Sequence, residues 1–301
     1  MISVGIFTGY FPYGLNEVID KMKALGFSNA QLDLDFRDMD MSTESLNDAS
    51  AKTIRTAFRN ANLPISCVSS YVNLVHPVPE ERKKNLDRLR KIISIARELG
   101  SAYVISETGT FNEDSDWVHD AKNKTEEGYE ICRDIIGEVC EFAGKHDVQF
   151  LIETYVNNVI GSVEETQRLF ADINSPHLGL LMDPTNYFET HNIDNMDNEL
   201  NKIFDALSGS IRIAHAKDVK RAEDEASEKH AEIDAAESHT LRGVGAIDLP
   251  APGLGVLNYD LYLNRLKKDH PNIPIIIEHL DEADVPRAKK FLDGKLEAVG
   301  G

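Results

Sequence analysis

Cysteine is scarce in this chain, and the few copies are not spaced as ligand or disulfide cysteines are. Cys67, Cys132 and Cys140 are odd in number and include no CxxC pair, which argues against a disulfide framework and a thiolate zinc site. We therefore expect reduced thiols and a cytoplasmic location. The first residues, MISVGIFTGY, lack a basic segment followed by an apolar one, so we expect no secretory signal there.

Positive charge and long apolar runs are also in short supply. The chain has 32 Lys and Arg residues against 51 Asp and Glu residues, for a formal net charge of −19. Such a surface repels nucleic-acid phosphates and anionic lipid, which argues against both as partners. No run approaches the roughly 18 apolar residues that a membrane span needs. A locally basic site for a phosphorylated substrate stays open, and so does a homo-oligomer.

The sequence does contain eight short apolar runs, each followed by an amphipathic stretch. Its 301 residues are 42% hydrophobic and 28% charged, which is ordinary for a soluble globular protein. The apolar runs predict strands at residues 2–7, 30–35, 65–70, 103–106, 148–152, 178–182, 211–214 and 273–277. Helical periodicity predicts helices at residues 15–25, 46–62, 80–99, 126–146, 163–173, 199–207, 259–268 and 282–296.

This alternation predicts an α/β fold, a single (β/α)₈ TIM barrel that forms one domain over residues 1–301. An open doubly wound sheet is the alternative, but no GxGxxG follows the first strand. The one irregularity is a long insertion between strand 7 and helix 7, at residues 219–257. It contains the charged run RAEDEASEKHAEIDAAE and then a Gly- and Pro-rich stretch. We expect a solvated extension at the active-site face, with a short surface helix or a mobile flap as alternatives for the run.

Four side chains that can bind a metal stand at the ends of the last four predicted strands. Glu153 follows FLI, Asp183 follows LLM, His215 follows IRIA and Glu278 follows III. The carboxyl ends of all strands in a parallel barrel meet at one mouth, where active sites lie. The first two spacings, 30 and 32 residues, match a barrel unit of roughly 31 residues. The last, 63 residues, is one unit plus the insertion, so we expect the four side chains to converge.

Three carboxylates gathered at one mouth would repel one another unless a cation lay among them. Two glutamates, one aspartate and one imidazole form a mixed set of oxygen and nitrogen ligands. Such a set disfavours a soft metal and suits one divalent metal ion, for which we expect Mn²⁺, with Co²⁺, Mg²⁺, Fe²⁺ and Zn²⁺ as alternatives. Each residue alone could be an ordinary polar residue at a strand end, but four at matched positions favour a metal site.

The order of these motifs resembles the xylose isomerase-like sugar isomerase and epimerase family. That family includes tagatose 3-epimerase-type enzymes, inosose dehydratase and apurinic endonuclease IV. The resemblance rests on IET, DPTN, HAKD and IEH at the four strand ends and on APGLGVLNY before the seventh predicted helix. It covers essentially the whole chain. Each motif is short, and together their order and spacing are specific for the superfamily but not for a substrate.

The resemblance implies a metal-dependent sugar isomerase or epimerase whose metal is held by Glu153, Asp183, His215 and Glu278. In such enzymes the metal chelates a carbonyl and a neighbouring hydroxyl, favours loss of the adjacent C–H proton and stabilises the enediolate. Glu153 and Glu278 would then be catalytic carboxylates on opposite faces of the sugar, one removing a proton and the other returning it. Which acts first is not assigned. The implied partner is a small-molecule carbohydrate.

Two positions depart from the pattern of typical ketose epimerases. Family members that act on free ketoses usually carry His three residues after the aspartate ligand, where this chain has Asn186. An amide can bind a hydroxyl but cannot act as an acid or base at neutral pH. Many members have a His near the end of strand four, where this chain has Glu107. Both departures favour a less usual substrate, so an inosose dehydratase-like lyase and a 3-keto-glycoside epimerase stay as alternatives.

Weaker candidates for substrate binding, besides Glu107 and Asn186, lie in the loops around the predicted mouth. Lys217 could polarise a carbonyl or bind an anion, and Arg242 in the insertion could clamp a carboxylate or a phosphate. Trp117, the only tryptophan, could pack against a sugar ring. The last two are Asn157 and Tyr71. Each of these side chains could equally serve a structural contact.

Two other classes of function fit the sequence less well. A DNA-repair enzyme like endonuclease IV needs a trinuclear zinc site with more histidines, whereas here strand two ends in Asp33 and Asp35 and strand three in Tyr71. The net charge also disfavours a nucleic-acid substrate. A non-catalytic sugar-binding barrel would have no need of two opposed glutamates, Glu153 and Glu278.

Overall fold

Eight parallel strands close into a barrel in the computed structural model, which describes residues 1–222, 240–242 and 247–300. The order of strands around the barrel is β1-β11-β7-β6-β5-β4-β3-β2. They are β1 (Ser3–Phe7), β2 (Asn29–Leu32), β3 (Ile65–Ser69), β4 (Tyr103–Glu107), β5 (Gln149–Glu153), β6 (Leu178–Met182), β7 (Ile211–Ala216) and β11 (Pro274–Ile277). The predicted (β/α)₈ TIM barrel is thereby confirmed.

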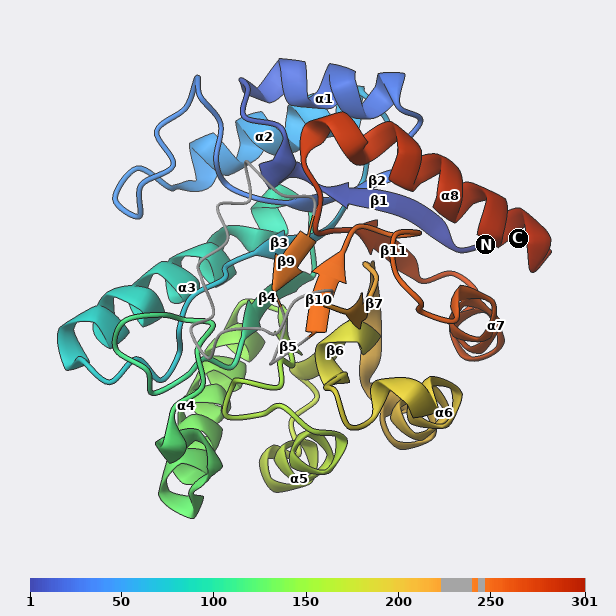
Figure 1. Ribbon diagram of the computed structural model, residues 1–301. Helices are drawn as coiled ribbons and strands as arrows, with labels where there is room; N and C mark the ends of the chain where they lie inside the picture. Colours follow the sequence, from blue (N-terminus) through green and yellow to red (C-terminus); the bar gives the residue numbers. More distant parts are fainter. Residues whose placement is uncertain (223–239, 243–246, 301) are drawn as a thin grey trace.

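A helix follows each barrel strand, and Figure 1 shows these helices as an outer ring around the strands. They are α1 (Leu15–Ala24), α2 (Asp48–Asn60), α3 (Pro79–Leu99), α4 (Glu126–Lys145), α5 (Val163–Ile173), α6 (Met196–Leu207), α7 (Tyr259–Asp269) and α8 (Val285–Ala298). Local sequence explains where they begin and end. The hydroxyl of Ser162 and the carboxylate of Glu165 cap the start of α5 reciprocally. Gly100 ends α3 in the left-handed region that favours glycine.

Several predicted boundaries differ from the structure, those of α6 and β2 among them. Helix α6 begins at Met196, about one turn before the predicted start, and the acidic Asp197 in its first turn suits the positive end of the helix dipole. Strand β2 ends at Leu32, so Asp33 follows the strand instead of lying in it. The backbone leaves the sheet there because the N–H of Asp33 donates to the hydroxyl of Thr8 at 2.7 Å.

Layers of side chains fill the barrel and determine which residues reach its mouth. One buried layer consists of six residues, Cys67, Ile105, Leu151, Leu181, Ile213 and Ile276. Side chains alternate along a strand, so residues two positions farther along also point inward, one layer nearer the carboxyl ends. On the last five barrel strands those residues are Glu107, Glu153, Asp183, His215 and Glu278. The sheet register therefore places a layer of charged side chains directly next to a layer of apolar ones.

The insertion after β7 contains a small antiparallel sheet that the sequence did not predict. Its strands, in the order β8-β10-β9, are β8 (Lys220–Arg221), β9 (Thr240–Arg242) and β10 (Ile247–Pro250). All four residues of β10 are buried, so this part differs from the expected solvated extension. The carboxylate of Asp218 anchors it, accepting from the N–H groups of Val219, Gly253 and Leu257 at 2.9 Å each. Most of the charged run, from residue 223 onward, lies outside the described residues.

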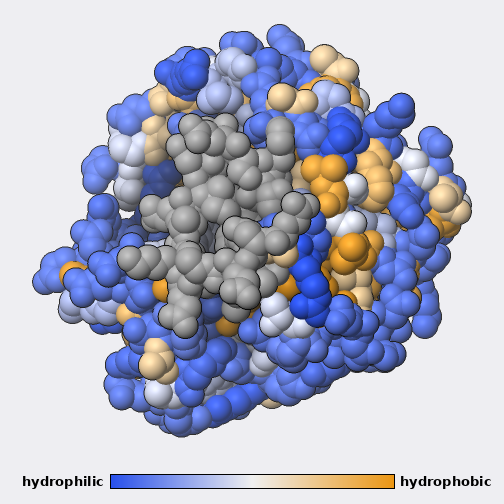
Figure 2. Space-filling model, in the orientation of Figure 1, coloured by the Kyte–Doolittle hydropathy of each residue, from blue (hydrophilic) through white to orange (hydrophobic). Residues whose placement is uncertain are grey.

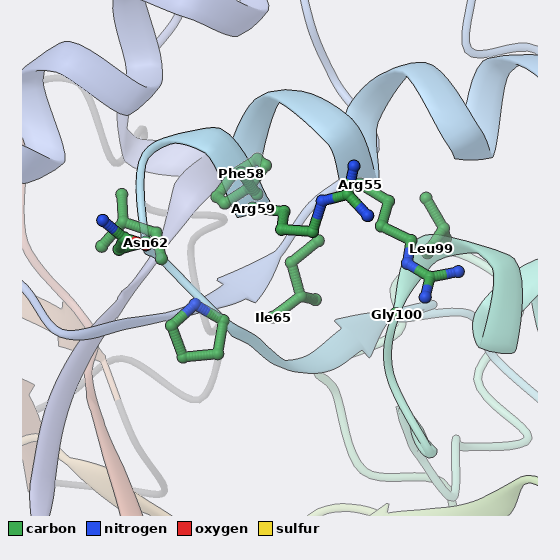
Figure 3. Close-up of a pocket in the computed structure, with 9 residues that line it drawn as sticks. Arg55, Phe58, Arg59, Asn62, Ile65, Leu99 and Gly100 are labelled. Atoms are coloured by element: carbon green, nitrogen blue, oxygen red, sulfur yellow. The ribbon is translucent and has the colours of Figure 1, made fainter.

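Most of the visible described surface is hydrophilic, with smaller hydrophobic areas to one side (Figure 2). Within the described ranges, no helix combines the length and apolar character needed to cross a bilayer. A hollow of about 370 Å³ with two arginines, Arg55 and Arg59, lies where β3 and β4 begin (Figure 3), at the opposite end of the barrel from the charged layer.

Candidate metal centre

Four metal-binding side chains come together at the mouth of the barrel. Glu153 ends β5, Asp183 follows β6, His215 lies in β7 and Glu278 follows β11. One ligand atom from each lies within 4.8 Å of the others. All four are buried, and Glu278, the least buried, is only 6% exposed. The strand ends therefore bring together the four residues that the sequence spacing singled out.

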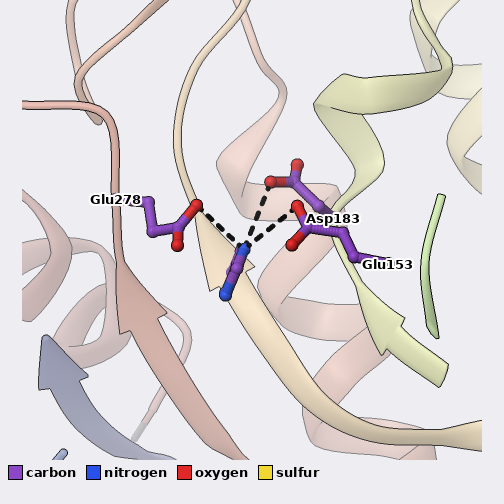
Figure 4. A group of neighbouring side chains, drawn as sticks. Glu153, Asp183 and Glu278 are labelled. Carbon is purple, nitrogen blue, oxygen red and sulfur yellow. Dashed lines mark ion pairs between the residues drawn. The ribbon is translucent and has the colours of Figure 1, made fainter. Parts of the chain in front are cut away.

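The Nδ1 atom of His215 lies at the centre of this group. It is 3.2 Å from Oε2 of Glu278 and 3.5 Å from both Oε1 of Glu153 and Oδ2 of Asp183. Figure 4 shows Glu278 on one side of the group and Glu153 with Asp183 on the other. Among the described residues, no group forms a hydrogen bond with this buried nitrogen. A buried imidazole nitrogen left without a partner and facing three carboxylate oxygens suits a divalent cation, so these residues fit a metal.

The outer oxygens of two ligands are held by nearby hydroxyl groups. Oδ1 of Asp183 accepts from the backbone N–H of Thr185 at 3.0 Å and from its hydroxyl at 2.7 Å. Oε2 of Glu153 accepts from the hydroxyl of Tyr71 at 2.6 Å. Hydrogen bonds of this kind fix the direction in which a carboxylate presents its other oxygen to a metal. The remaining oxygens therefore point into the centre.

Lys217 brings a positive charge to the same carboxylates. Its Nζ lies 2.8 Å from Oδ2 of Asp183, 3.7 Å from Oε1 of Glu153 and 3.8 Å from Oε2 of Glu278. It also donates to Oδ1 of Asn186 at 3.1 Å. Burial alone would lower the pKa of Lys217, but Asp183 and Glu153 raise it above its ordinary value. The lysine is therefore a cation and offsets part of the repulsion among the carboxylates.

The pKa values in the layer follow from this close packing of opposite charges. Burial lowers the pKa of His215, but the carboxylates of Glu278 and Glu153 outweigh it and raise that pKa well above its ordinary value. Burial raises the pKa of Glu153, but His215 and Lys217 hold it below its ordinary value. Glu107 pairs in register with Glu153 on the neighbouring strand. Burial and the charge of Glu153 raise the pKa of Glu107 well above its ordinary value, which favours its protonated form.

The other residues proposed from the sequence differ in whether they contact this centre. Asn186 belongs to it, because its Nδ2 donates to Oε1 of Glu153 at 2.8 Å. Asn157 instead ties two loops together, donating from its side chain to the carbonyl of Trp117 at 2.9 Å. The side chain of Trp117 is 48% exposed. The backbone of Arg242 lies in β9, but its side chain is outside what the structure describes.

Sequence reasoning missed Gln31, which is buried at the centre, and His279, which is half-buried and whose Nε2 lies 3.3 Å from Nζ of Lys217. Gln31 lies in β2 and contacts both His215 and Glu278. His279 follows the last ligand, and burial together with the nearby charge of Lys217 lowers its pKa to about 3. A signal for Gln31 was present, because AQLDLD alternates and the face of a barrel strand opposite the helices points inward.

Comparison with known proteins agrees with the barrel and its centre. The family model for the xylose isomerase-like TIM barrel matches residues 19–295. No curated protein matches in sequence. A xylose isomerase-like TIM barrel protein from Mycobacterium smegmatis, solved in complex with magnesium, is 16% identical, with a TM-score of 0.69 over 99% of this chain and 96% of that one.

Two further solved structures carry epimerase names. A D-tagatose 3-epimerase-like protein is 18% identical, with a TM-score of 0.70 over 99% of this chain and 98% of that one. A 3-keto-D-glucoside 4-epimerase from E. coli, in its apo form, is 15% identical, with a TM-score of 0.65 over 100% of this chain and 99% of that one. At these identities the likeness shows the shared fold.

Proposed function

The chain belongs to the xylose isomerase-like TIM barrel family, and from this premise we propose that it is a metal-dependent sugar isomerase or epimerase. The observation that carries the proposal is the placement of two glutamates around one ligand centre. Glu278 approaches Nδ1 of His215 at 3.2 Å from one side and Glu153 at 3.5 Å from the other (Figure 4). The epimerase names among structures with this fold support the class of reaction.

Glu153, Asp183, His215 and Glu278 would hold one divalent metal ion. We expect Mn²⁺, with Co²⁺, Mg²⁺, Fe²⁺ or Zn²⁺ as alternatives, because the set combines three carboxylates with one imidazole. When bound, such an ion supplies a Lewis acid that polarises a sugar carbonyl and acidifies the neighbouring C–H. The magnesium in one structure of the same fold agrees with a divalent ion.

The two glutamates would move the protons. One carboxylate takes the proton from the carbon next to the carbonyl, and the electron pair of that C–H bond moves into the carbonyl to give an enediolate. The other glutamate, in its carboxylic acid form, donates a proton to the opposite face of the same carbon, which inverts it. Each turnover exchanges the protonation states of Glu153 and Glu278, and exchange with water restores them.

Polar groups next to the glutamates would orient the sugar. Lys217 is placed to donate to an oxygen that gains negative charge, because its Nζ lies within 4 Å of three carboxylates of the centre. Glu107 and Asn186 would contact hydroxyl groups, and the exposed ring of Trp117 would pack against the sugar. The hydroxyl of Tyr71 is engaged with a ligand, so its effect on the sugar would be indirect.

A lyase that expels a hydroxyl group after the same proton abstraction is the second candidate. Glu107 favours it, because a half-buried carboxyl with a raised pKa next to Glu153 can protonate a leaving hydroxyl. The same feature is compatible with epimerisation of a 3-keto-glycoside, for which one structure of this fold is named. The two outcomes differ in their products, because only the lyase releases water.

Hydrogen exchange in deuterated water tests the proposal. The full chain, loaded with Mg²⁺ or with Mn²⁺ that is removed before spectra are taken, is incubated with ketoses, 3-keto-glycosides and inososes. NMR then follows deuterium at carbon and the appearance of a stereoisomer or a dehydrated product. Glu153→Gln and Glu278→Gln should each lower exchange by about 10²–10⁴-fold. Glu138→Gln, on the exposed side of α4, should leave it unchanged. Unchanged exchange in both site variants would overturn the mechanism.

A further inference from the structure

We propose that Gln31 is a positioning residue that fixes the ring of His215 in its metal-binding form and aims Glu278 at the same metal. The inference rests on the proposed function only in requiring that the four residues bind a metal. Gln31 lies in β2, across the barrel from β7, and its side chain is completely buried. It is neutral and is not itself one of the four ligands.

The surroundings of the Gln31 amide allow only one orientation. One end of the amide lies 3.3 Å from Oε1 of Glu278, and the other lies 2.8 Å from Nε2 of His215. In the ionised form that binds a metal, Glu278 can only accept hydrogen bonds, so the NH₂ group must then face Glu278. The amide oxygen is then left for His215 and requires a proton on Nε2. In a neutral ring the lone pair must therefore be on Nδ1, which is the nitrogen that faces the carboxylates.

The second N–H of the Gln31 amide extends the same network to another ligand. It donates to the hydroxyl of Tyr71 at 3.2 Å, and that hydroxyl donates to Oε2 of Glu153 at 2.6 Å. Each hydrogen-bond direction along this path is set by the carboxylates at its ends. One amide thus contacts two of the ligands directly and a third through Tyr71, which leaves only Asp183 outside the network.

The neutrality of Gln31 matters as much as its hydrogen bonds. A glutamate there would add a fourth negative charge about 3 Å from Glu278 and would oppose its ionised form. An apolar side chain would leave Nε2 of His215 and Oε1 of Glu278 buried without a partner. The amide supplies an acceptor to one ligand and a donor to the other without adding a charge. The expected effect falls on His215 and Glu278, while Thr185 continues to hold Asp183.

The substitution Gln31→Leu tests the inference, because it keeps the size of the side chain and removes both hydrogen bonds. The dissociation constant for Zn²⁺ or Mn²⁺ is measured on the metal-stripped full chain by competition with a chromophoric chelator, with no sugar present. Loss of a partner behind a ligand typically weakens metal binding 10–100-fold, and we expect a change of that size. The matched control is Gln149→Leu at the start of β5. Gln149 bonds Arg212 and the carbonyl of Pro176 at the far end of the barrel.

A second measurement reports on the His215 ring itself. In the Zn²⁺-loaded protein labelled with ¹⁵N-histidine, NMR should show a Nε2–H proton that is protected from exchange and is absent in His215→Asn. In Gln31→Leu that signal should shift and exchange faster, and in Gln149→Leu it should stay unchanged. A merely structural role for Gln31 would lower the melting temperature without altering this signal.

The outcomes separate this inference from the proposed function. Equal metal affinity in Gln31→Leu and the unaltered protein, with the same ring signal, overturns the inference alone. An equal loss of affinity in Gln149→Leu overturns it too, because the effect would then be general instability. Metal binding by the unaltered protein without any hydrogen exchange in sugars overturns the proposed reaction and leaves the inference standing. Failure of the unaltered protein to bind a divalent ion overturns both.

Discussion

The two halves of the barrel mouth contribute side chains of different kinds. Strands β5, β6, β7 and β11 present the four charged or metal-binding residues, and their ligand atoms lie within 4.8 Å of one another. On the facing strands, β2 supplies Gln31, and Tyr71 follows β3, both uncharged and bonded to those ligands. Glu107 on β4 is the charged exception. The half formed by β5, β6, β7 and β11, the ligand half, thus carries the four candidate metal ligands. In the facing half, Gln31 and Tyr71 hold three of these side chains in position.

Replacing a residue of the ligand half should have the largest effect. His215→Gln removes the nitrogen on which the three carboxylates converge, so affinity for Mn²⁺ should fall by more than the 10–100-fold typical of a partner behind a ligand. Chelator competition measures it, and removal of metal by a chelator should abolish turnover until Mn²⁺ is restored. A smaller loss in His215→Gln than in Gln31→Leu would break the distinction between the two halves.

Lys217 offers a second test of the ligand half, because it is one of the two cationic side chains, with His215, that face the carboxylates when no metal is bound. Lys217→Met removes part of this compensating charge, and breaking a buried ion pair typically costs about 3–5 kcal/mol. The metal-free variant should lose about that much unfolding free energy, and added metal should restore much of it. Urea unfolding with and without Mn²⁺ measures both quantities.

The control for this test is Lys202→Met, which breaks an exposed pair with Glu164 and should cost less than about 1 kcal/mol. If metal stabilises Lys217→Met no more than it stabilises the unaltered protein, then the lysine does not offset the repulsion among the carboxylates.

The same division into halves explains how far the sequence could predict the site. The ligands could be located because their residue types and their places at strand ends are both visible in the chain. Alternation in AQLDLD could place Gln31 on an inward face but could not show its role, because its partners are 184 and 247 residues away and an amide carries no charge that marks that role. Tyr71 was only a weaker candidate for contact with the sugar, and the bond of its hydroxyl to Glu153 was not predicted. Which groups meet across a barrel depends on register, and register is set by packing.

Strand β10 was missed for a related reason. Its four residues are too few to show a period, and the polar insertion around them suggested solvent exposure. Its burial depends on Asp218, which anchors the loop from the end of β7, and on contact with His279, whose Nδ1 lies 3.2 Å from the carbonyl of Leu249. Neither contact is local in sequence, so no short pattern could reveal them.

Asp218 provides a third test, with a smaller expected effect. It concerns the loop after β7, which this carboxylate anchors next to the ligand half. Both carboxylate oxygens accept backbone N–H groups, Oδ1 from Val219 and Leu257 and Oδ2 from Gly253. Asp218→Asn must therefore turn an NH₂ group toward at least one donor. Leaving buried donors unsatisfied costs about 1–3 kcal/mol, and urea unfolding should show a loss of that size. Asp260→Asn, at a side chain that is 61% exposed, should change the stability little.

Tyr71→Phe should give the smallest effect. It tests the facing half, where Gln31 and Tyr71 support the candidate ligands. It removes one hydroxyl between Gln31 and Glu153, and a typical hydrogen bond contributes about 1 kcal/mol net, which is less than the roughly 1.4 kcal/mol of a tenfold change in affinity. Because the ring stays to fill its place, we expect metal affinity to fall less than tenfold. If the hydroxyl instead binds the sugar, KM will rise while the metal dissociation constant is unchanged.

The double variant Tyr71→Phe with Gln31→Leu tests whether Gln31 and Tyr71 act as one unit. The hydroxyl that donates to Glu153 also accepts from Gln31, so the second substitution should cost less metal affinity once the first is made. Residues in one hydrogen-bond network commonly show such coupling, whereas independent sites add. Additive losses in metal affinity would mean that Gln31 and Tyr71 support their ligands separately, and the contrast between the halves would reduce to two unrelated contacts.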